Sequence, residues 1–333
     1  MNKLNQHYYS LDLFRALAGY GVAICHFYYY VFNQENFQFY SIFFVEFFFI
    51  LSGFVLYPQL AKVYADKKNL NIFFMRRWFR TIPLYLLALI CYSILFKKFD
   101  ADTLKYTFFI QKLTSTFLEY DYFSVAWSLS VEEVFYIIFP LFLIIFNRIN
   151  FLNIIIIFLS IIYFLKFSYI LKDSVDNEFF RVGTFLRLDA IAFGLIIRKY
   201  YFQLKNIYFH LLIGFLICYF INSLESLSEL NKYKIFIFIF LIQIFSINIL
   251  SIFLWFNKFI NIQFLKKLFS LLSKQTYSVY LFHLFPIYYL KKNNFLLNEY
   301  SLFAFYLLVL FVISTLSYYL FEKPILIKRP NYK

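Results

Sequence analysis

The sequence predicts an all-α, polytopic integral membrane protein of about ten transmembrane helices, with both ends of the chain on the cytoplasmic side. Of its 333 residues, 62% are hydrophobic, and the mean hydropathy is +0.68. Apolar runs of about 20 residues, the length that crosses a bilayer as a helix, recur along the chain. Lys and Arg are also shared unevenly between alternate connections, which sets the orientation.

The apolar runs predict ten spans joined by short connections. We therefore expect one membrane domain over residues 1–333, with no room for an appended soluble catalytic domain. The first span is not a signal peptide, because it is too long and carries Asp12, Arg15 and His26. The expected spans are 11–32, 39–60, 80–96, 124–147, 151–171, 182–198, 207–223, 233–256, 267–290 and 300–321.

The basic residues orient these spans. With the N-terminus inside, 19 of the 32 Lys and Arg residues fall on inner connections and 10 on outer ones. The net charge of +14 is then explained by topology and anionic lipid, without nucleic acid. The three cysteines are scattered through spans and give neither a metal pattern nor a disulfide framework. The outer connections carry most of the acids: Glu35, Asp100, Asp102, Glu119, Asp121, Asp173, Asp176, Glu178, Glu225, Glu229 and Glu299.

The first span holds the most informative polar residues. Arg15 and His26 are eleven positions apart, about three helical turns, so they lie on nearly the same face about 16 Å apart. Asp12 falls close to the same stripe. An ionisable group at membrane depth costs roughly 2.5–3.5 kcal/mol on insertion scales, so this stripe predicts a functional site.

Five spans place ionisable residues at a similar depth in the outer leaflet. Because exposure to lipid is too unfavourable, we expect these groups to line one shared, wet cavity. They are His26, Glu46, Glu132 with Glu133, Arg187 with Asp189, and His283.

Several of these residues also have a simpler structural interpretation. Ser130 and Glu133 fit a capping box, which would make Glu133 a helix cap. Asp12 is either a first-turn acid that favours the helix dipole or part of the site. His283, near the end of its span, could be an interfacial hydrogen-bonding residue. Arg187 and Asp189 are two apart and need separate partners.

The inner side is rich in arginine. Arg76, Arg77 and Arg80 precede Pro83 at the expected start of the third span, and Arg15 lies near the inner end of the first. They serve either as a topology signal or as an anion site, because a guanidinium offers a bidentate fork that suits phosphate. The sequence thus predicts a phosphate-attracting inner mouth and an outer layer of histidine and carboxylate.

Seven motifs in order give the chain a family resemblance. It resembles the integral-membrane acyltransferase 3 family, bacterial enzymes that mostly O-acetylate surface and exported glycans. It departs at Glu46, where the family usually has Asp. The motifs are LDLFRALAGYGVAICH (11–26), VEFFFILSGF (45–54), RRWFRTIPLY (76–85), WSLSVEEVFYIIFP (127–140), RLDAIAFG (187–194), YSVYLFH (277–283) and FEKP (321–324).

The resemblance implies acetyl-CoA as a co-substrate that enters from the cytoplasm, with no bound cofactor. The acceptor would be a hydroxyl of a glycan or lipid-linked sugar on the outer side of the bacterial cytoplasmic (inner) membrane. The chain resembles the stand-alone branch, because it lacks the extra span and the fused SGNH esterase-like domain of some relatives.

Acyl transfer to an alcohol needs a base, and His26 is the only histidine deep in a span. Glu46 or Glu132 would orient its imidazole, as carboxylates do in other base–acid pairs. Either direct transfer or an acetyl-His26 intermediate is compatible with the sequence. For binding, we expect Arg15 to hold Asp12 or the thioester end of the donor. Arg76, Arg77 and Arg80 would hold the CoA phosphates, and Arg187, Asp189 and His283 the acceptor.

Two other function classes fit a polytopic chain with buried charges. A flippase or proton-coupled exporter of a glycan or lipid-linked sugar also needs a buried proton relay. Against it, the sequence has no paired half-sequence repeats and no matched Gly/Pro-broken spans. A glycan polymerase would depend on long outer loops, and the longest here has a modest length of about 27 residues.

Overall fold

The computed structural model describes residues 7–114, 118–171, 177–200, 207–222, 231–293 and 298–332, and these contain helices and no strand. The expected outer-side residues Lys172, Asp173, Asp176, Glu225 and Glu229 lie outside the described residues. The α-helices are α1 (Tyr9–Phe32), α2 (Glu35–Ala65), α3 (Asn69–Phe96), α4 (Ala101–Thr107), α5 (Ala126–Ile145), α6 (Phe151–Ile170), α7 (Asn177–Val182), α8 (Leu188–Tyr200), α9 (Ile207–Asn222), α10 (Lys232–Phe256), α11 (Gln263–Phe282), α12 (Leu284–Asn293), α13 (Glu299–Leu316) and α14 (Lys323–Ile327). Short 3-10 turns, η2 (Phe185–Arg187) and η5 (Asn257–Phe259), and a π-helical turn, η6 (Ser317–Glu322), join some of them.

The helices confirm the predicted class, an all-α polytopic membrane protein. Within the described part of the chain, six helical stretches are long and apolar enough to cross a membrane, and α9 is a shorter apolar helix. The number of ten spans and the inward position of both ends stay predictions. The six stretches are Glu35–Ala65, Asn69–Phe96, Ala126–Ile145, Phe151–Ile170, Lys232–Phe259 and Glu299–Ile327.

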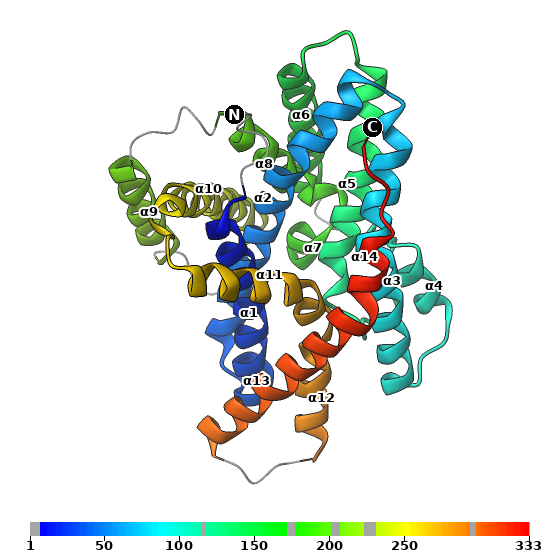
Figure 1. Cartoon of the computed structure of the whole chain (residues 1–333), viewed down its shortest axis with the longest axis vertical. Helices are drawn as coiled ribbons and strands as arrows, with labels where there is room; N and C mark the ends of the chain where they lie inside the picture. The colour runs from blue at the N-terminus through cyan, green and yellow to red at the C-terminus, as the bar shows by residue number, and fades with distance from the viewer. Residues whose placement is uncertain are drawn as a thin grey trace.

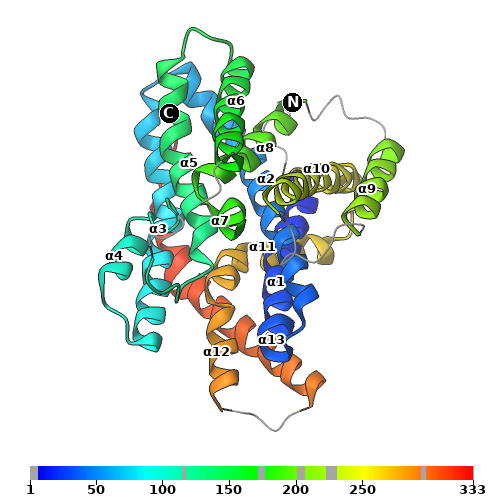
Figure 2. The same ribbon diagram turned by 180° about the vertical axis from the view of Figure 1, so that it is seen from behind.

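Helix α2 lies at the centre of the bundle, between α1 and α8 (Figures 1 and 2). Its close crossing with α8 depends on two glycines, Gly53 and Gly194. A Cβ atom at Gly53 would overlap the carbonyl oxygen of Ile191, and one at Gly194 would overlap that of Ile50. These glycines therefore bring the two backbones together, as small residues do between membrane helices.

Helix α3 begins before the predicted span that starts at residue 80, and helix α5 begins before the helix cap predicted at Ser130. Helix α3 starts at Asn69, so Arg76 and Arg77 lie within it together with Arg80, and not before it. Helix α5 starts at Ala126, so Ser130 lies inside the helix, where its hydroxyl donates to the carbonyl of Ala126 at 3.2 Å. The predicted capping box at Ser130 is therefore wrong, because the residues before it already have helical geometry.

The predicted span 267–290 is two helices that meet at His283 (Figure 1). Pro286 explains the break: it has no N–H to donate to the carbonyl four residues earlier, and its ring clashes with that carbonyl. Carbonyls near the break accept hydrogen bonds from other helices instead. Tyr92 of α3 donates to Leu281 O at 3.1 Å, and Tyr306 of α13 donates to His283 O at 3.3 Å. The bend is thus held from two sides.

Candidate active site

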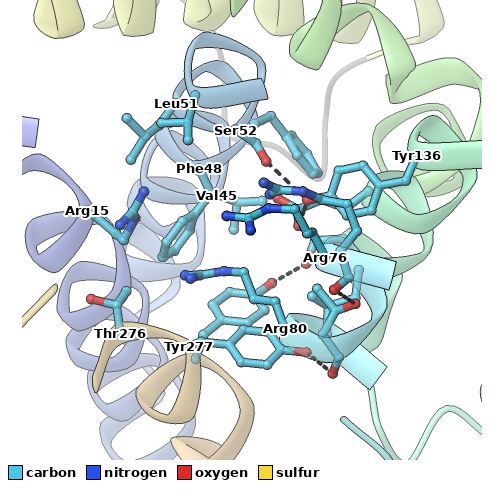
Figure 3. Close-up of a pocket in the computed structure, with 18 of the residues that line it drawn as sticks. Arg15, Val45, Phe48, Leu51, Ser52, Arg76, Arg80, Tyr136, Thr276 and Tyr277 are labelled. Carbon is cyan, nitrogen blue, oxygen red and sulfur yellow. Dashed lines mark hydrogen bonds between the residues drawn. The ribbon is translucent and has the colours of Figure 1, made fainter. Parts of the chain in front are cut away.

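A cavity of about 310 Å³ opens between five helices, and we call it the arginine cavity. The helices are α2, α5 and α11, together with the first halves of α1 and α3. Five arginines line it, together with the carboxyl group of Glu132. Figure 3 shows Arg80 reaching across this space towards α1, where Arg15 lies opposite. The arginines are Arg15, Arg76, Arg77, Arg80 and Arg329.

The arginines differ in how firmly protein groups hold them. Arg15 donates to Ser273 Oγ at 3.3 Å, and Arg77 donates to Gln59 Oε1 at 2.5 Å. Arg76 donates to the carbonyl of Pro330 at 2.6 Å. Arg80 has no hydrogen bond to another described residue, so its guanidinium is the one most available to an anion. Such a cluster of like charges is unfavourable when empty and attracts a polyanion.

A second cavity, of about 150 Å³, lies towards the other end of the bundle, and we call it the histidine cavity. His26 lines it, together with aromatic, amide and charged groups from α1, α2, α7 and the segment before α5. Lys112 pairs with Asp121 at 2.7 Å, Arg181 pairs with Glu178, and the Arg181 guanidinium lies 5.9 Å from the ring centroid of Trp127. Aromatic faces beside hydrogen-bonding groups suit a polyhydroxylated ligand.

The two cavities meet at two shared lining residues, Val45 of α2 and Tyr280 of α11. The Tyr280 hydroxyl lies 2.6 Å from Ser128 Oγ, which fixes the ring in place between the cavities. Along α1, Arg15 in one cavity and His26 in the other are about 16 Å apart by helical rise. A ligand held by the arginines would reach His26 only through a narrow extended arm that passes Tyr280.

His26 has a second histidine as its partner. Its Nδ1 lies 2.8 Å from Nε2 of His283, and the two rings stack with centroids 5.0 Å apart. His283 Nδ1 lies 2.7 Å from the carbonyl oxygen of Tyr280, which can only accept. His283 therefore carries its proton on Nδ1, its Nε2 accepts from His26 Nδ1–H, and the lone pair of His26 is on Nε2.

This chain of hydrogen bonds leaves His26 Nε2 as the basic nitrogen at the histidine cavity. His26 is partly exposed and lines the cavity, whereas His283 is fully buried. Because His283 sits where α11 breaks, the carbonyl of Tyr280, one turn back, comes within reach of its ring. The bend between α11 and α12 thus selects the tautomer of a histidine on α1.

Glu46 and Arg187 form a buried ion pair on the other side of α2. Beside it, Lys166 donates to Asp189 at 2.5 Å, and Gln243 donates to the same carboxylate at 3.0 Å. All four charged side chains are at most 2% exposed. This carboxylate–cation network joins α2, α6, η2, α8 and α10, and none of its charged members lines either cavity.

The predicted shared outer cavity is therefore wrong. The structure divides six of its seven members among three places, and the seventh, Glu133, is buried and lines neither cavity. His26 and His283 are together, Glu132 lines the arginine cavity, and Glu46, Arg187 and Asp189 form the buried network. Among the described residues, no carboxylate contacts His26, so neither Glu46 nor Glu132 orients it. Glu46 follows Val45, which lines both cavities. Because the side chains of successive helical residues point about 100° apart, Glu46 points away from the cavities.

The inner residues were predicted more successfully than the outer ones. Arg15, Arg76, Arg77 and Arg80 do line one cavity, although Asp12 contacts His7 at 2.7 Å and not Arg15. Their role in binding a donor stays a prediction. Five further residues line the cavities and were not predicted from the sequence as part of the site: Tyr280, Trp127, Asp121, Arg181 and Arg329. Tyr280 and Trp127 do lie in the quoted motifs, whereas Arg181 and Arg329 carry no local signal.

Comparison with known proteins gives the family of the chain. The profile of the acyltransferase 3 family, described as an acyltransferase domain, matches residues 8–322. The chain belongs to this family. It is 28% identical to the peptidoglycan O-acetyltransferase OatA of Listeria monocytogenes over 123 residues, which are 31% of this chain and 20% of that protein.

A second relative is the putative peptidoglycan O-acetyltransferase YrhL of Bacillus subtilis. The identity is 30% over 165 residues, which are 43% of this chain and 25% of that protein. The matches thus span a quarter or less of the curated relatives. No solved structure matches the chain.

Proposed function

We propose that this acyltransferase family member moves an acetyl group from acetyl-CoA to a hydroxyl of a glycan, with His26 as the general base. The observation that carries the proposal is the hydrogen-bond chain from Tyr280 O through His283 to His26. It leaves a basic nitrogen at a cavity that meets a separate, arginine-lined cavity. The resemblance to peptidoglycan O-acetyltransferases supports a cell-wall glycan as the acceptor.

The arginine cavity supports an acyl-CoA donor. Five arginines and one glutamate line it, a strongly positive balance that suits the phosphate groups of CoA. The pantetheine arm is thin and extended and carries the thioester at its end. With the phosphates at the arginines, this arm would pass Tyr280 and present the thioester to His26.

The histidine cavity supports a sugar hydroxyl as the acceptor. Trp127 offers an aromatic face to the C–H groups of a sugar ring, and Asp121, Arg181 and Gln38 offer hydrogen-bonding groups around it. In the predicted orientation this cavity lies towards the outer surface, where an exported glycan would be found. The donor and acceptor would then approach from opposite sides of the membrane.

The proposed reaction needs two proton transfers, one to His26 and one from it. The acceptor hydroxyl attacks the thioester carbon while His26 Nε2 takes its proton, and the C–S bond then breaks. The CoA thiolate leaves and receives the proton from Nε2, which restores the neutral imidazole. During the reaction the imidazolium keeps its hydrogen bond from Nδ1–H to His283, and this bond strengthens when its donor is charged.

Reconstituted protein tests the proposal directly. Proteoliposomes are supplied with acetyl-CoA labelled in the acetyl group and with peptidoglycan fragments, and labelled ester is measured on the fragments. Label should transfer with wild-type protein and be released by mild alkali. Movement of the fragments across the bilayer without acetyl transfer would contradict the proposal and favour a transporter.

A further inference from the structure

Four residues after α14, Arg329–Tyr332, line the arginine cavity or contact residues that line it, and we call this segment the strap. In Figure 1 it runs as a red trace from α14 towards the end of the bundle where α3 begins. Arg76 of α3 holds it by donating to Pro330 O at 2.6 Å, with Asn331 Oδ1 at 3.5 Å from the same nitrogen. The strap is thus fixed by a residue that itself lines the cavity.

Tyr332 fastens the strap to α2 as well. Its hydroxyl donates to Gln59 Oε1 at 3.4 Å, and Gln59 is also the partner of Arg77. The ring of Tyr332 lies between two cations, with Lys62 Nζ 4.6 Å and the Arg76 guanidinium 5.2 Å from its centroid. Tyr332 therefore bridges α2 and α3. Its hydroxyl bonds to α2, and its ring attracts a cation from each helix.

Arg329 is the strap residue that lines the cavity. Its Nε donates to the carbonyl of Leu326 at 3.1 Å, which orients the two terminal nitrogens of the guanidinium. Burial and the neighbouring guanidinium groups of Arg80, Arg76 and Arg77 lower the pKa of Arg329 to about 10. Such crowding of positive charge is relieved when an anion binds among the groups.

We propose that the strap is part of the donor site, with Arg329 binding a phosphate group of the acyl-CoA and Tyr332 and Arg76 holding the strap over it. The inference rests on the proposed function and extends it to residues beyond the matched 8–322. It also gives Arg76 a different task from the one predicted from sequence. Arg76 is a positioning residue that acts through the strap, whereas Arg80 and Arg329 contact the donor.

The test compares two neighbouring substitutions in the full chain. Arg329→Gln removes a cavity-lining charge, and Lys328→Gln removes an exposed charge one residue earlier. Binding of CoA is measured by titration of the purified protein in lipid nanodiscs, and the KM for acetyl-CoA is measured in the transfer assay. We expect Arg329→Gln to weaken CoA binding and raise KM by about tenfold to a hundredfold, with kcat little changed. Lys328→Gln should match the wild type, and Arg329→Lys should lie between.

A double-mutant cycle tests the role of the strap. If Arg76 acts by holding it, Arg76→Gln should raise the KM in the wild-type background and add little in the Arg329→Gln background. Tyr332→Ala should behave like Arg76→Gln. Additive effects of Arg76→Gln and Arg329→Gln would overturn the positioning role.

The outcomes separate this inference from the proposed function. If the wild type binds CoA and Arg329→Gln binds it equally well, or if Lys328→Gln weakens binding as much, the strap has no part in the donor site. In that case the acetyl-CoA donor still stands. If the wild type itself does not bind CoA, the donor assignment fails and the strap proposal fails with it.

Discussion

The histidine pair and the carboxylate–cation network both bring polar side chains of different helices together inside the bundle, yet they have different relations to the cavities. His26 lines a cavity, and its only hydrogen-bond partner among the described residues is another histidine. In the network, Glu46 faces Arg187 and Lys166 faces Asp189, away from both cavities. A polar side chain at membrane depth is therefore not by itself a sign of a catalytic group. The histidine pair differs from the network in that one of its members lines a cavity.

The largest effect on activity is expected at His26. His26→Ala removes the proposed base and should lower acetyl transfer by about 10²- to 10⁴-fold, while the protein stays folded in the membrane. The proteoliposome assay measures the rate, and His7→Ala is a matched control because His7 lines neither cavity. Transfer at the wild-type rate by His26→Ala would remove the mechanism.

Substitutions in the carboxylate–cation network should lower the stability of the protein and leave its activity little changed. Glu46→Ala leaves Arg187 buried without its partner, which typically costs about 3–5 kcal/mol of folding free energy. Thermal unfolding in detergent should show the loss, whereas acetyl transfer per folded molecule should stay near that of the wild type. The double variant Glu46→Leu with Arg187→Met removes both charges and should recover much of the stability. A folded but inactive Glu46→Ala protein would return Glu46 to the active site.

His283 should lie between these two cases. His283→Ala removes the acceptor for His26 Nδ1–H, a bond to a charged donor during the reaction. The loss of about 1.5–3 kcal/mol predicts a fall in kcat of roughly tenfold to a hundredfold. His283→Gln, whose amide oxygen can accept from Nδ1–H, should be partly active. Equal activity of the Ala and Gln variants would show that His283 acts only by filling space.

The smallest expected effect is Arg80→Lys, which keeps the charge and removes the bidentate fork. If Arg80 binds a phosphate, the KM for acetyl-CoA should rise by about tenfold with little change in kcat, because the phosphates are held alike in the ground and transition states. If Arg80 serves only topology, Lys should substitute freely, because insertion counts both residues alike. An unchanged KM therefore supports the topology interpretation.

The sequence by itself determined the class of the protein and most of its polar inventory. Apolar runs of membrane length predicted a polytopic helical chain, and helical spacing placed Arg15 and His26 on one stripe. The sequence also predicted that arginines gather on the inner side. Arg77 and Arg80 are three residues apart, so they share a face of any helix that contains both, wherever that helix begins. These features depend on local spacing along one helix, and local spacing is visible in the sequence.

Only the tertiary structure decided which polar groups meet. Val45 and Glu46 are neighbours in the chain, but one faces the cavities and the other Arg187, because the orientation of α2 is set by its crossing with α8 at Gly53 and Gly194. His283 reaches His26 because α11 ends just before it, at Phe282, and the bend is held by Tyr92 and Tyr306. The partner of a side chain depends on how helices distant in sequence cross and rotate, and no single helix encodes that relation.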